Sequence, residues 1–245
     1  MNDLDFLREH FQGDADALKR AIKEYEKGTP AAYITGRRFF YRNDFIVKPG
    51  VLIPRPDTEF VVENAVSILK KKNAPVIFAD LCCGSGCIGI TVADEIKNAF
   101  GYLFDIGEVP LEVSAENAEK IGVSQRCQVL CGDVFDSSLL SSKIGKRLDM
   151  IISNPPYIPT EDIKKYPDLA AEPALALDGG ADGMDFYRAI IDNFEKDLED
   201  GGCFVFEIGF DQGLLIRELG AQKGFDVTVK KDYGQNDRLA ILKKS

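Results

Sequence analysis

Apolar residues near the start of the chain recur at steps of three and four, the spacing that places side chains on one face of a helix. One such series runs through residues 4–11 and a second through residues 18–25, with Gly13 between them. Glycine is a poor helix former and commonly separates two helices. The pattern predicts two short amphipathic helices in a small helical appendage over residues 1–28.

Two strand-like runs follow this appendage. Residues 38–41 and 45–47 are rich in aromatic and branched side chains, and the polar residues 42–44 separate them. Two such runs around a short polar segment are typical of a β-hairpin. We therefore expect a hairpin linker over residues 29–50, ahead of a main domain over residues 51–245.

The main domain alternates between helical and strand-like segments. Helical patterns occur at residues 58–72, 87–97, 111–121 and 212–222. Short apolar strands occur at residues 76–79, 100–104, 127–130, 150–152 and 202–207. The last two runs, residues 226–231 and 238–243, predict an antiparallel hairpin at the edge of the sheet. The alternation predicts an α/β domain whose mainly parallel sheet is covered by helices on both faces.

The composition narrows the class of protein. Hydrophobic residues make up 45% of the 245 residues and charged residues 29%, which is ordinary for a soluble globular protein. The net charge of -10 argues against a protein that binds nucleic acid mainly through a basic surface. We expect a monomer without a direct nucleic-acid partner.

Targeting and metal signals are not visible in the sequence. The first residues are acidic and no apolar run follows them, so we expect neither a secretory signal nor a membrane span. The six cysteines are then expected to be reduced thiols of a cytoplasmic protein. Their spacing does not match common zinc sites and His10 is the single histidine, so we expect no metal.

A glycine-rich loop over residues 80–89 follows the first strand of the main domain and opens a helix. Residues 84–89 spell G-x-G-x-x-G, so a nicotinamide dinucleotide with Asp105 on its ribose is one interpretation. The other is S-adenosylmethionine, for which Asp80 would face the loop and complement a cationic ligand. The loop alone leaves both interpretations open.

Three acidic residues follow three predicted parallel strands. Asp80, Asp105 and Asp133 each stand at the carboxyl end of such a strand, and Val134 follows the third. Ligands of open α/β sheets bind in the crevice at these ends, so the three carboxyl groups are expected to converge there. Asp133 could accept a hydrogen bond from an adenine amine, or it could simply cap a turn.

The strand at residues 150–152 is followed by Asn154-Pro155-Pro156-Tyr157. An amide or aromatic amine is a poor nucleophile because its nitrogen lone pair is delocalised. If Asn154 and the Pro155 carbonyl accept both N–H bonds, the lone pair can be directed at the methyl group of a sulfonium. The prolines restrict the backbone, and Tyr157 can pack on the planar acceptor. Orientation and preorganised polar groups would then supply most of the catalysis.

A set of motifs carries a resemblance to a known family. They are Asn154-Pro155-Pro156-Tyr157, Leu52 to Glu59, Asp80 to Gly86, Glu172-Pro173 with Ala176 to Gly180, and Glu207-Ile208-Gly209 with Gln212. The chain thereby resembles the protein-(glutamine-N5) methyltransferases over roughly residues 28 to 243. Within that family it is most similar to the enzymes that methylate the glutamine of the Gly-Gly-Gln motif in bacterial peptide-chain release factors.

The resemblance implies a Rossmann-like, seven-stranded methyltransferase fold whose last strand is antiparallel. It implies S-adenosylmethionine as cofactor, S-adenosylhomocysteine as product and a release factor as protein partner. The implied cofactor residues are Asp80, Cys82, Gly84, Gly86, Asp105 (ribose), Asp133 (adenine), Val134 and Asn154.

The same resemblance implies the residues around the acceptor. Asn154, Pro155, Pro156 and Tyr157 correspond to the catalytic clamp on the glutamine amide. Arg55 and Glu172 belong to segments that border the active site and are expected to contact the substrate. Physical reasoning alone would also allow Arg55 and Asp57 to form an ordinary ion pair.

Other functions use the same residue types. A methyltransferase for adenine or another exocyclic base amine needs the same Asn-Pro-Pro-Tyr motif, but the acidic composition and the lack of a target-recognition domain count against it. A glutamine methyltransferase of a ribosomal protein is a further alternative. A binding module without turnover is a third, and the intact Asn154 argues against it.

Overall fold

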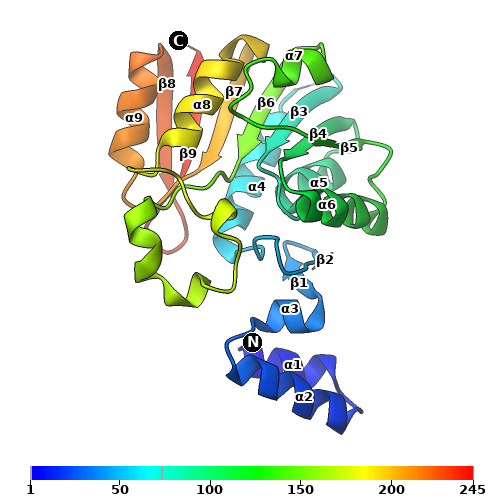
Figure 1. Ribbon diagram of the computed structural model, residues 1–245. Coiled ribbons are helices and arrows are strands. Elements are labelled where there is room, and N and C mark those ends of the chain that lie inside the picture. Colours follow the sequence, from blue (N-terminus) through cyan, green and yellow to red (C-terminus); the bar gives the residue numbers. More distant parts are fainter. Residues whose placement is uncertain (1, 73, 245) are drawn as a thin grey trace.

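A seven-stranded mixed sheet organises the larger part of the chain (Figure 1). The computed structural model describes residues 2–72 and 74–244. The strands are β3 (Val76–Leu81), β4 (Ala99–Asp105), β5 (Cys127–Cys131), β6 (Leu148–Ser153), β7 (Leu198–Glu207), β8 (Phe225–Lys231) and β9 (Asp237–Lys244). Their order across the sheet is β5-β4-β3-β6-β7-β9-β8, with β9 antiparallel to both neighbours. The predicted seven-stranded α/β fold with its antiparallel last strand is confirmed.

Helices cover both faces of the sheet because successive side chains of each strand point to opposite sides. Phe78 on β3 and Val205 on β7 belong to one buried cluster, and their neighbours Ala79 and Phe206 belong to the other. The first cluster includes α4 (Pro56–Leu69), α5 (Cys87–Glu95) and α6 (Glu108–Ile121). The second includes α7 (Leu139–Lys143), α8 (Asp185–Phe194) and α9 (Gly213–Gln222).

Two of these helices were not predicted from the sequence. Helix α7 has five residues, too few for a periodic pattern. Helix α8 does carry a pattern, because Tyr187, Ile190, Ile191 and Phe194 are fully buried and follow the spacing of one helix face. Short 3-10 helices precede α8 in the sequence at Thr160–Lys165, Pro167–Leu169 and Ala174–Ala176, and another follows it at Glu195–Asp197.

The N-terminal helices lie apart from the sheet in Figure 1 and have their own small core. Helices α1 (Asp3–His10) and α2 (Ala15–Glu26) confirm the two predicted helices, and α3 (Ala31–Thr35) is an addition. The expected boundary at residue 28 falls between α2 and α3, and that at residue 50 falls between the hairpin and α4. This division into parts remains a proposal.

The hairpin forms, but its turn is displaced from the predicted position. Strands β1 (Arg37–Phe40) and β2 (Asn43–Ile46) leave only Tyr41 and Arg42 in the turn, so the prediction of a turn at residues 42–44 was wrong. Asn43 and Asp44 pair with the opposite strand instead. Tyr41 adopts a φ of 57°, and its N–H donates to Glu59 Oε1 at 2.9 Å. A two-residue hairpin turn needs such a positive φ.

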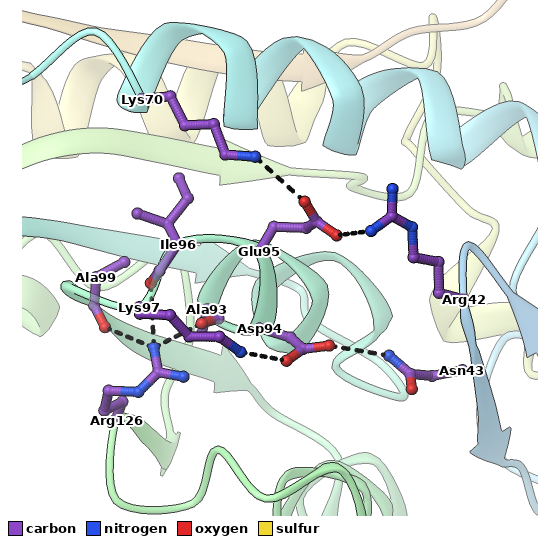
Figure 2. A network of polar contacts seen from close by, with 10 residues as sticks. All are labelled: Arg42, Asn43, Lys70, Ala93, Asp94, Glu95, Ile96, Lys97, Ala99 and Arg126. Atoms are coloured by element: carbon purple, nitrogen blue, oxygen red, sulfur yellow. Dashed lines mark hydrogen bonds and ion pairs between the residues drawn. The ribbon is translucent and has the colours of Figure 1, made fainter.

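Ion pairs and hydrogen bonds join the hairpin to the end of α5 (Figure 2). Arg42 pairs with Glu95 at 2.9 Å, and Lys70 of the α4 C-cap approaches the same carboxylate at 3.2 Å. Asn43 Nδ2 donates to Asp94 at 3.3 Å. The hairpin therefore lies against the main domain through several polar contacts.

Asn117 of α6 makes the most buried of these connections. Its Oδ1 accepts the Ile46 N–H at 2.7 Å, and its Nδ2 donates to the carbonyl groups of Ile46 and Ser85, each at 3.0 Å. The side chain is fully buried. One amide thus ties β2 of the hairpin to the glycine-rich loop.

Over residues 2–72 and 74–244, no helix is both long enough and apolar enough to cross a membrane.

Substituting Asn117→Ala is expected to lower the free energy of unfolding by about 1–3 kcal/mol, because it leaves the half-buried backbone groups of Ile46 and the buried Ser85 carbonyl without their partner. Chemical denaturation would measure the change. The matched control, Glu119→Ala on the exposed face of the same helix, should change stability by less than about 0.5 kcal/mol. Equal effects of the two substitutions would contradict the role given to Asn117.

Candidate active site

A cavity of about 310 Å³ opens at the carboxyl ends of the parallel strands. Eight of the residues predicted from the sequence line it: Arg55, Cys82, Gly84, Asp105, Asp133, Val134, Asn154 and Pro156. Asp105 ends β4, the others follow strands β3, β5 and β6, and Arg55 stands at the start of α4. The edge of the sheet thus gathers residues that lie 100 positions apart in the sequence.

A smaller pocket of about 70 Å³ adjoins this cavity. Pro155 and Tyr157 line it together with Glu207, which ends β7. Asn154 and Arg55 line both spaces, so they stand at the boundary between them. We call the larger space the cofactor cavity and the smaller one the acceptor pocket.

The glycine-rich loop is held in an unusual backbone conformation beside the cofactor cavity. Cys82, Gly84 and Gly86 have φ values of 58°, 56° and 77°, in the left-handed region that favours glycine. A Cβ at Gly86 would lie 2.7 Å from Ile90 Cδ1, so a side chain there would require a shift. Gly86 does not line the cavity. Its lack of a side chain shapes the loop by allowing this close approach to Ile90. Ser114 Oγ fixes the loop by donating to the Gly84 carbonyl at 2.8 Å.

Asp105 lines the cavity and supports the loop from the end of β4. Its Oδ2 accepts the Gly84 N–H and its Oδ1 accepts the Gly107 N–H, both at 2.9 Å. Burial raises the pKa of Asp105, and these N–H groups oppose the shift. Each oxygen keeps further acceptor capacity, which suits the hydroxyl groups of a ribose.

Asp80 lies beneath the loop instead of in the cavity. Its Oδ2 accepts the Gly89 N–H at 2.8 Å, and among the described residues its Oδ1 has no hydrogen-bond partner. Gly89 permits this approach because a Cβ there would lie 2.9 Å from Asp80 Oδ2. Burial raises the pKa of Asp80 to about 7. Direct contact of Asp80 with a cofactor remains a prediction, and the structure places the residue below the loop.

The far end of the cavity combines a polar turn with apolar surfaces. Asp133 is exposed, and its Oδ1 accepts the Phe135 N–H at 2.9 Å, while Val134 is buried. Ile106 and Phe135 line the cavity and are each 53% exposed. The flat ring of Phe135 and the apolar side chain of Ile106 suit contact with a planar ring. Neither residue was predicted from the sequence, although Ile106 directly follows β4 and Phe135 lies four residues after the end of β5.

Arg55 and Glu172 form an ion pair at the border of the two spaces. Glu172 Oε2 also accepts the Ile53 N–H at 2.9 Å, and its carboxylate is buried. Glu172 lines neither space, so it holds Arg55 and its segment in place. The pairing of Arg55 with Asp57 was wrong, because side chains two residues apart at a helix start point in different directions. Asp57 pairs with Arg238 at 3.2 Å.

Glu207 is the acidic residue of the acceptor pocket, and the sequence analysis gave it no role. Only 2% of the residue is exposed, and within the described parts of the chain its Oε2 has no hydrogen-bond partner. Burial raises its pKa to about 7, while Thr58, Arg238 and Tyr157 oppose the shift. Burial also raises the pKa of Tyr157 far above neutral pH, so that hydroxyl stays protonated.

A search for metal-binding clusters over residues 2–72 and 74–244 found no group of three or more histidine, cysteine, aspartate and glutamate side chains placed to hold an ion.

Comparison with known proteins identifies the family. The family model for the methyltransferase small domain matches residues 58–170. Release factor glutamine methyltransferases of Clostridium botulinum and Moorella thermoacetica are each 40% identical to this chain. The alignments cover 88% and 89% of the chain, respectively, and 76% of each relative.

A solved structure agrees with these matches. The release factor-specific protein-(glutamine-N5) methyltransferase of Alicyclobacillus acidocaldarius is 26% identical, with a TM-score of 0.50. The match covers 82% of this chain and all of that one. With two relatives at 40% identity over most of both lengths, this chain belongs to the family of release factor glutamine methyltransferases.

Proposed function

We propose that this protein transfers the methyl group of S-adenosylmethionine to the side-chain amide nitrogen of a glutamine in the Gly-Gly-Gln motif of a peptide-chain release factor. The observation that carries the proposal is the position of Asn154, which lines both the cofactor cavity and the acceptor pocket. A residue that orients the acceptor amide toward the cofactor has to stand at that boundary.

The residues of the cofactor cavity fit S-adenosylmethionine. Asp105 offers acceptor oxygens for a ribose diol, and Ile106 and Phe135 offer apolar surfaces for an adenine. The left-handed loop from Cys82 to Gly86 leaves room for a ligand beside the backbone. When bound, the cofactor supplies a methyl carbon activated by the positive charge of its sulfur.

The acceptor pocket fits the end of a glutamine side chain. Asn154 Oδ1 and the Pro155 carbonyl would accept the two N–H bonds of the amide, and Tyr157 would pack against its plane. The nitrogen lone pair is then directed toward the cofactor cavity. Holding both reactants in this geometry lowers the activation barrier, because a bimolecular reaction becomes effectively unimolecular.

Methylation leaves the amide nitrogen with a surplus proton and a positive charge. Glu207 lines the same pocket, and as a carboxylate it would stabilise that charge and accept the proton. Charged groups from other elements act on it as well: Arg238 of β9 favours the carboxylate, and Asp57 of α4 disfavours it. Its ionisation near neutral pH suits this task.

Purified protein incubated with labelled S-adenosylmethionine and a release factor is expected to label the glutamine of the Gly-Gly-Gln motif. Mass spectrometry of the peptide would locate the added methyl group. A release factor with that glutamine changed to alanine should stay unlabelled. Equal labelling of the alanine substrate, or transfer to nucleic acid instead, would refute the proposed substrate.

Substituting Asn154→Ala is expected to lower turnover about 100-fold or more, because it removes one acceptor that orients the amide. The dissociation constant for S-adenosylmethionine, measured by calorimetry, should change by less than about threefold. A parallel loss of turnover and cofactor affinity would place Asn154 on the cofactor alone.

Turnover of the wild-type protein is expected to rise as the pH increases through about 7, because Glu207 loses its proton over that range. In Glu207→Gln this rise should disappear and turnover at pH 8 should fall. Asp80 also has a raised pKa but remains in both proteins, so the difference between the two pH–rate profiles isolates Glu207. The control Glu199→Gln, on the exposed part of β7, should keep the wild-type profile. Superimposable profiles for wild type and Glu207→Gln would exclude this role.

A further inference from the structure

The side chain of Gln212 occupies a buried position immediately before α9, and only 4% of the residue is exposed. Its Nε2 donates to the carbonyl groups of Tyr157 and Gly183, each at 3.0 Å. Its Oε1 accepts the Gly209 N–H at 2.8 Å and the Tyr187 hydroxyl at 3.3 Å. An amide has two N–H donors and two acceptor lone pairs, so the hydrogen-bonding capacity of this one is fully used.

The contact with Tyr157 matters because of the chemistry of the turn that precedes it. Pro155 and Pro156 have no backbone N–H, so neither residue can be fixed by donating a hydrogen bond. These two residues can be held only through their carbonyl groups or through their neighbours in the chain. The carbonyl of Tyr157, directly after the two prolines, is held by Gln212 Nε2.

A glycine-rich segment packs against the same turn from a second direction. A Cβ at Gly183 would lie 2.3 Å from the Tyr157 carbonyl oxygen and 2.8 Å from Gln212 Nε2. A Cβ at Gly179 would lie 2.7 Å from Tyr157 Cα and 2.9 Å from the Pro156 carbonyl oxygen. Side chains at these positions would push the turn away, so the glycines permit a backbone-to-backbone contact.

Backbone hydrogen bonds complete this support. The Ile158 N–H donates to the Leu177 carbonyl at 3.0 Å, and the Gly179 N–H donates to the Ile158 carbonyl at 2.9 Å. These bonds hold the chain just after Tyr157, whereas Gln212 holds Tyr157 itself. The turn is therefore fixed on two sides. Ile158 and Leu177 line the acceptor pocket themselves, whereas Gln212 and the two glycines line neither space.

We infer that Gln212 is a positioning residue for methyl transfer. By fixing the Tyr157 carbonyl against Gly183, its amide sets the direction of the Pro155 carbonyl and of Asn154, which would hold the acceptor nitrogen. The inference rests on the proposed function. It assigns a task to Gln212 and to the Gly179–Gly183 segment, neither of which touches the reacting groups.

The main chain of Gln212 has a separate role that substitution of the side chain leaves intact. Its N–H donates to the Gly209 carbonyl and its carbonyl accepts the Ile216 N–H, both at 3.0 Å, which starts α9. A change confined to the side-chain amide therefore tests the contact with Tyr157 without removing the helix start.

The test is Gln212→Glu, which keeps the shape of the side chain but presents an oxygen to the two carbonyl groups in place of the NH₂ group. Turnover on a release factor is expected to fall about 100-fold, because a displacement of about 1 Å at a reacting group has an effect of that size. The dissociation constant for S-adenosylmethionine should stay within about threefold, because the cofactor cavity does not include this side chain. Gln222→Glu, the same change at an exposed position of α9, is the matched control and should keep wild-type turnover.

A pH profile distinguishes positioning from a general loss of structure. The carboxyl of the variant would lie buried between two carbonyl oxygens, so its pKa should be raised. In its protonated form it can donate to one of them. The turnover of Gln212→Glu relative to wild type is therefore expected to rise as the pH falls, at unchanged cofactor affinity.

Three results are distinguishable. Wild-type turnover in Gln212→Glu would overturn the inference, and so would an equal loss of turnover and cofactor affinity, since Gln212 would then support the whole domain. An inactive wild-type protein would instead refute the proposed function.

Gln212→Met, which removes all four hydrogen bonds, should lose turnover at every pH without recovery at low pH, and recovery there would also overturn the inference.

Discussion

Two adjacent prolines leave the middle of the turn after β6 without backbone donors, and the surrounding structure is arranged around that constraint. Asn154 and the Pro155 carbonyl can orient an acceptor only if the turn does not move. The sheet fixes its start through Ser153, whose Oγ donates to the Leu81 carbonyl at 2.6 Å. Its end is fixed by Gln212 and by a glycine-rich segment that approaches closely. The turn is therefore held rigid by neighbouring residues whose own side chains cannot be changed without moving it.

Buried acids with raised pKa values lie on two sides of the site. Asp80 supports the loop beside the cofactor cavity, and Glu207 lines the acceptor pocket. Burial disfavours the charged form of each, so each carboxyl titrates near neutral pH instead of near pH 4. Among the described residues each keeps one oxygen without a hydrogen-bond partner, but their places differ: Asp80 accepts a backbone N–H beneath the loop, and Glu207 lines the acceptor pocket.

Sequence patterns predicted the main elements because strand and helix periodicities are local. The hairpin turn was misplaced because the positive φ of Tyr41 depends on its bond to Glu59, eighteen residues further along the chain. Helix α8 was not predicted although its apolar residues follow the spacing of one helix face.

The site was harder to predict than the fold. Residues that follow strands, such as Asp105 and Asn154, could be located because parallel strands end at one edge. The roles of Glu172, Glu207 and Gln212 depend on contacts between distant segments, which no local pattern encodes. The sequence shows the motifs that contain these residues, but it does not show which atoms their side chains contact.

Asn117 joins the hairpin to the glycine-rich loop, and this has a consequence for how such enzymes can diversify. The helical appendage has its own core, whereas the hairpin shares hydrogen bonds with the main domain. A chimaera that exchanges the appendage should therefore be joined ahead of Gly36, so that the hairpin travels with the catalytic half. The N-terminal helices can then vary while the hydrogen bonds between the hairpin and the glycine-rich loop stay intact.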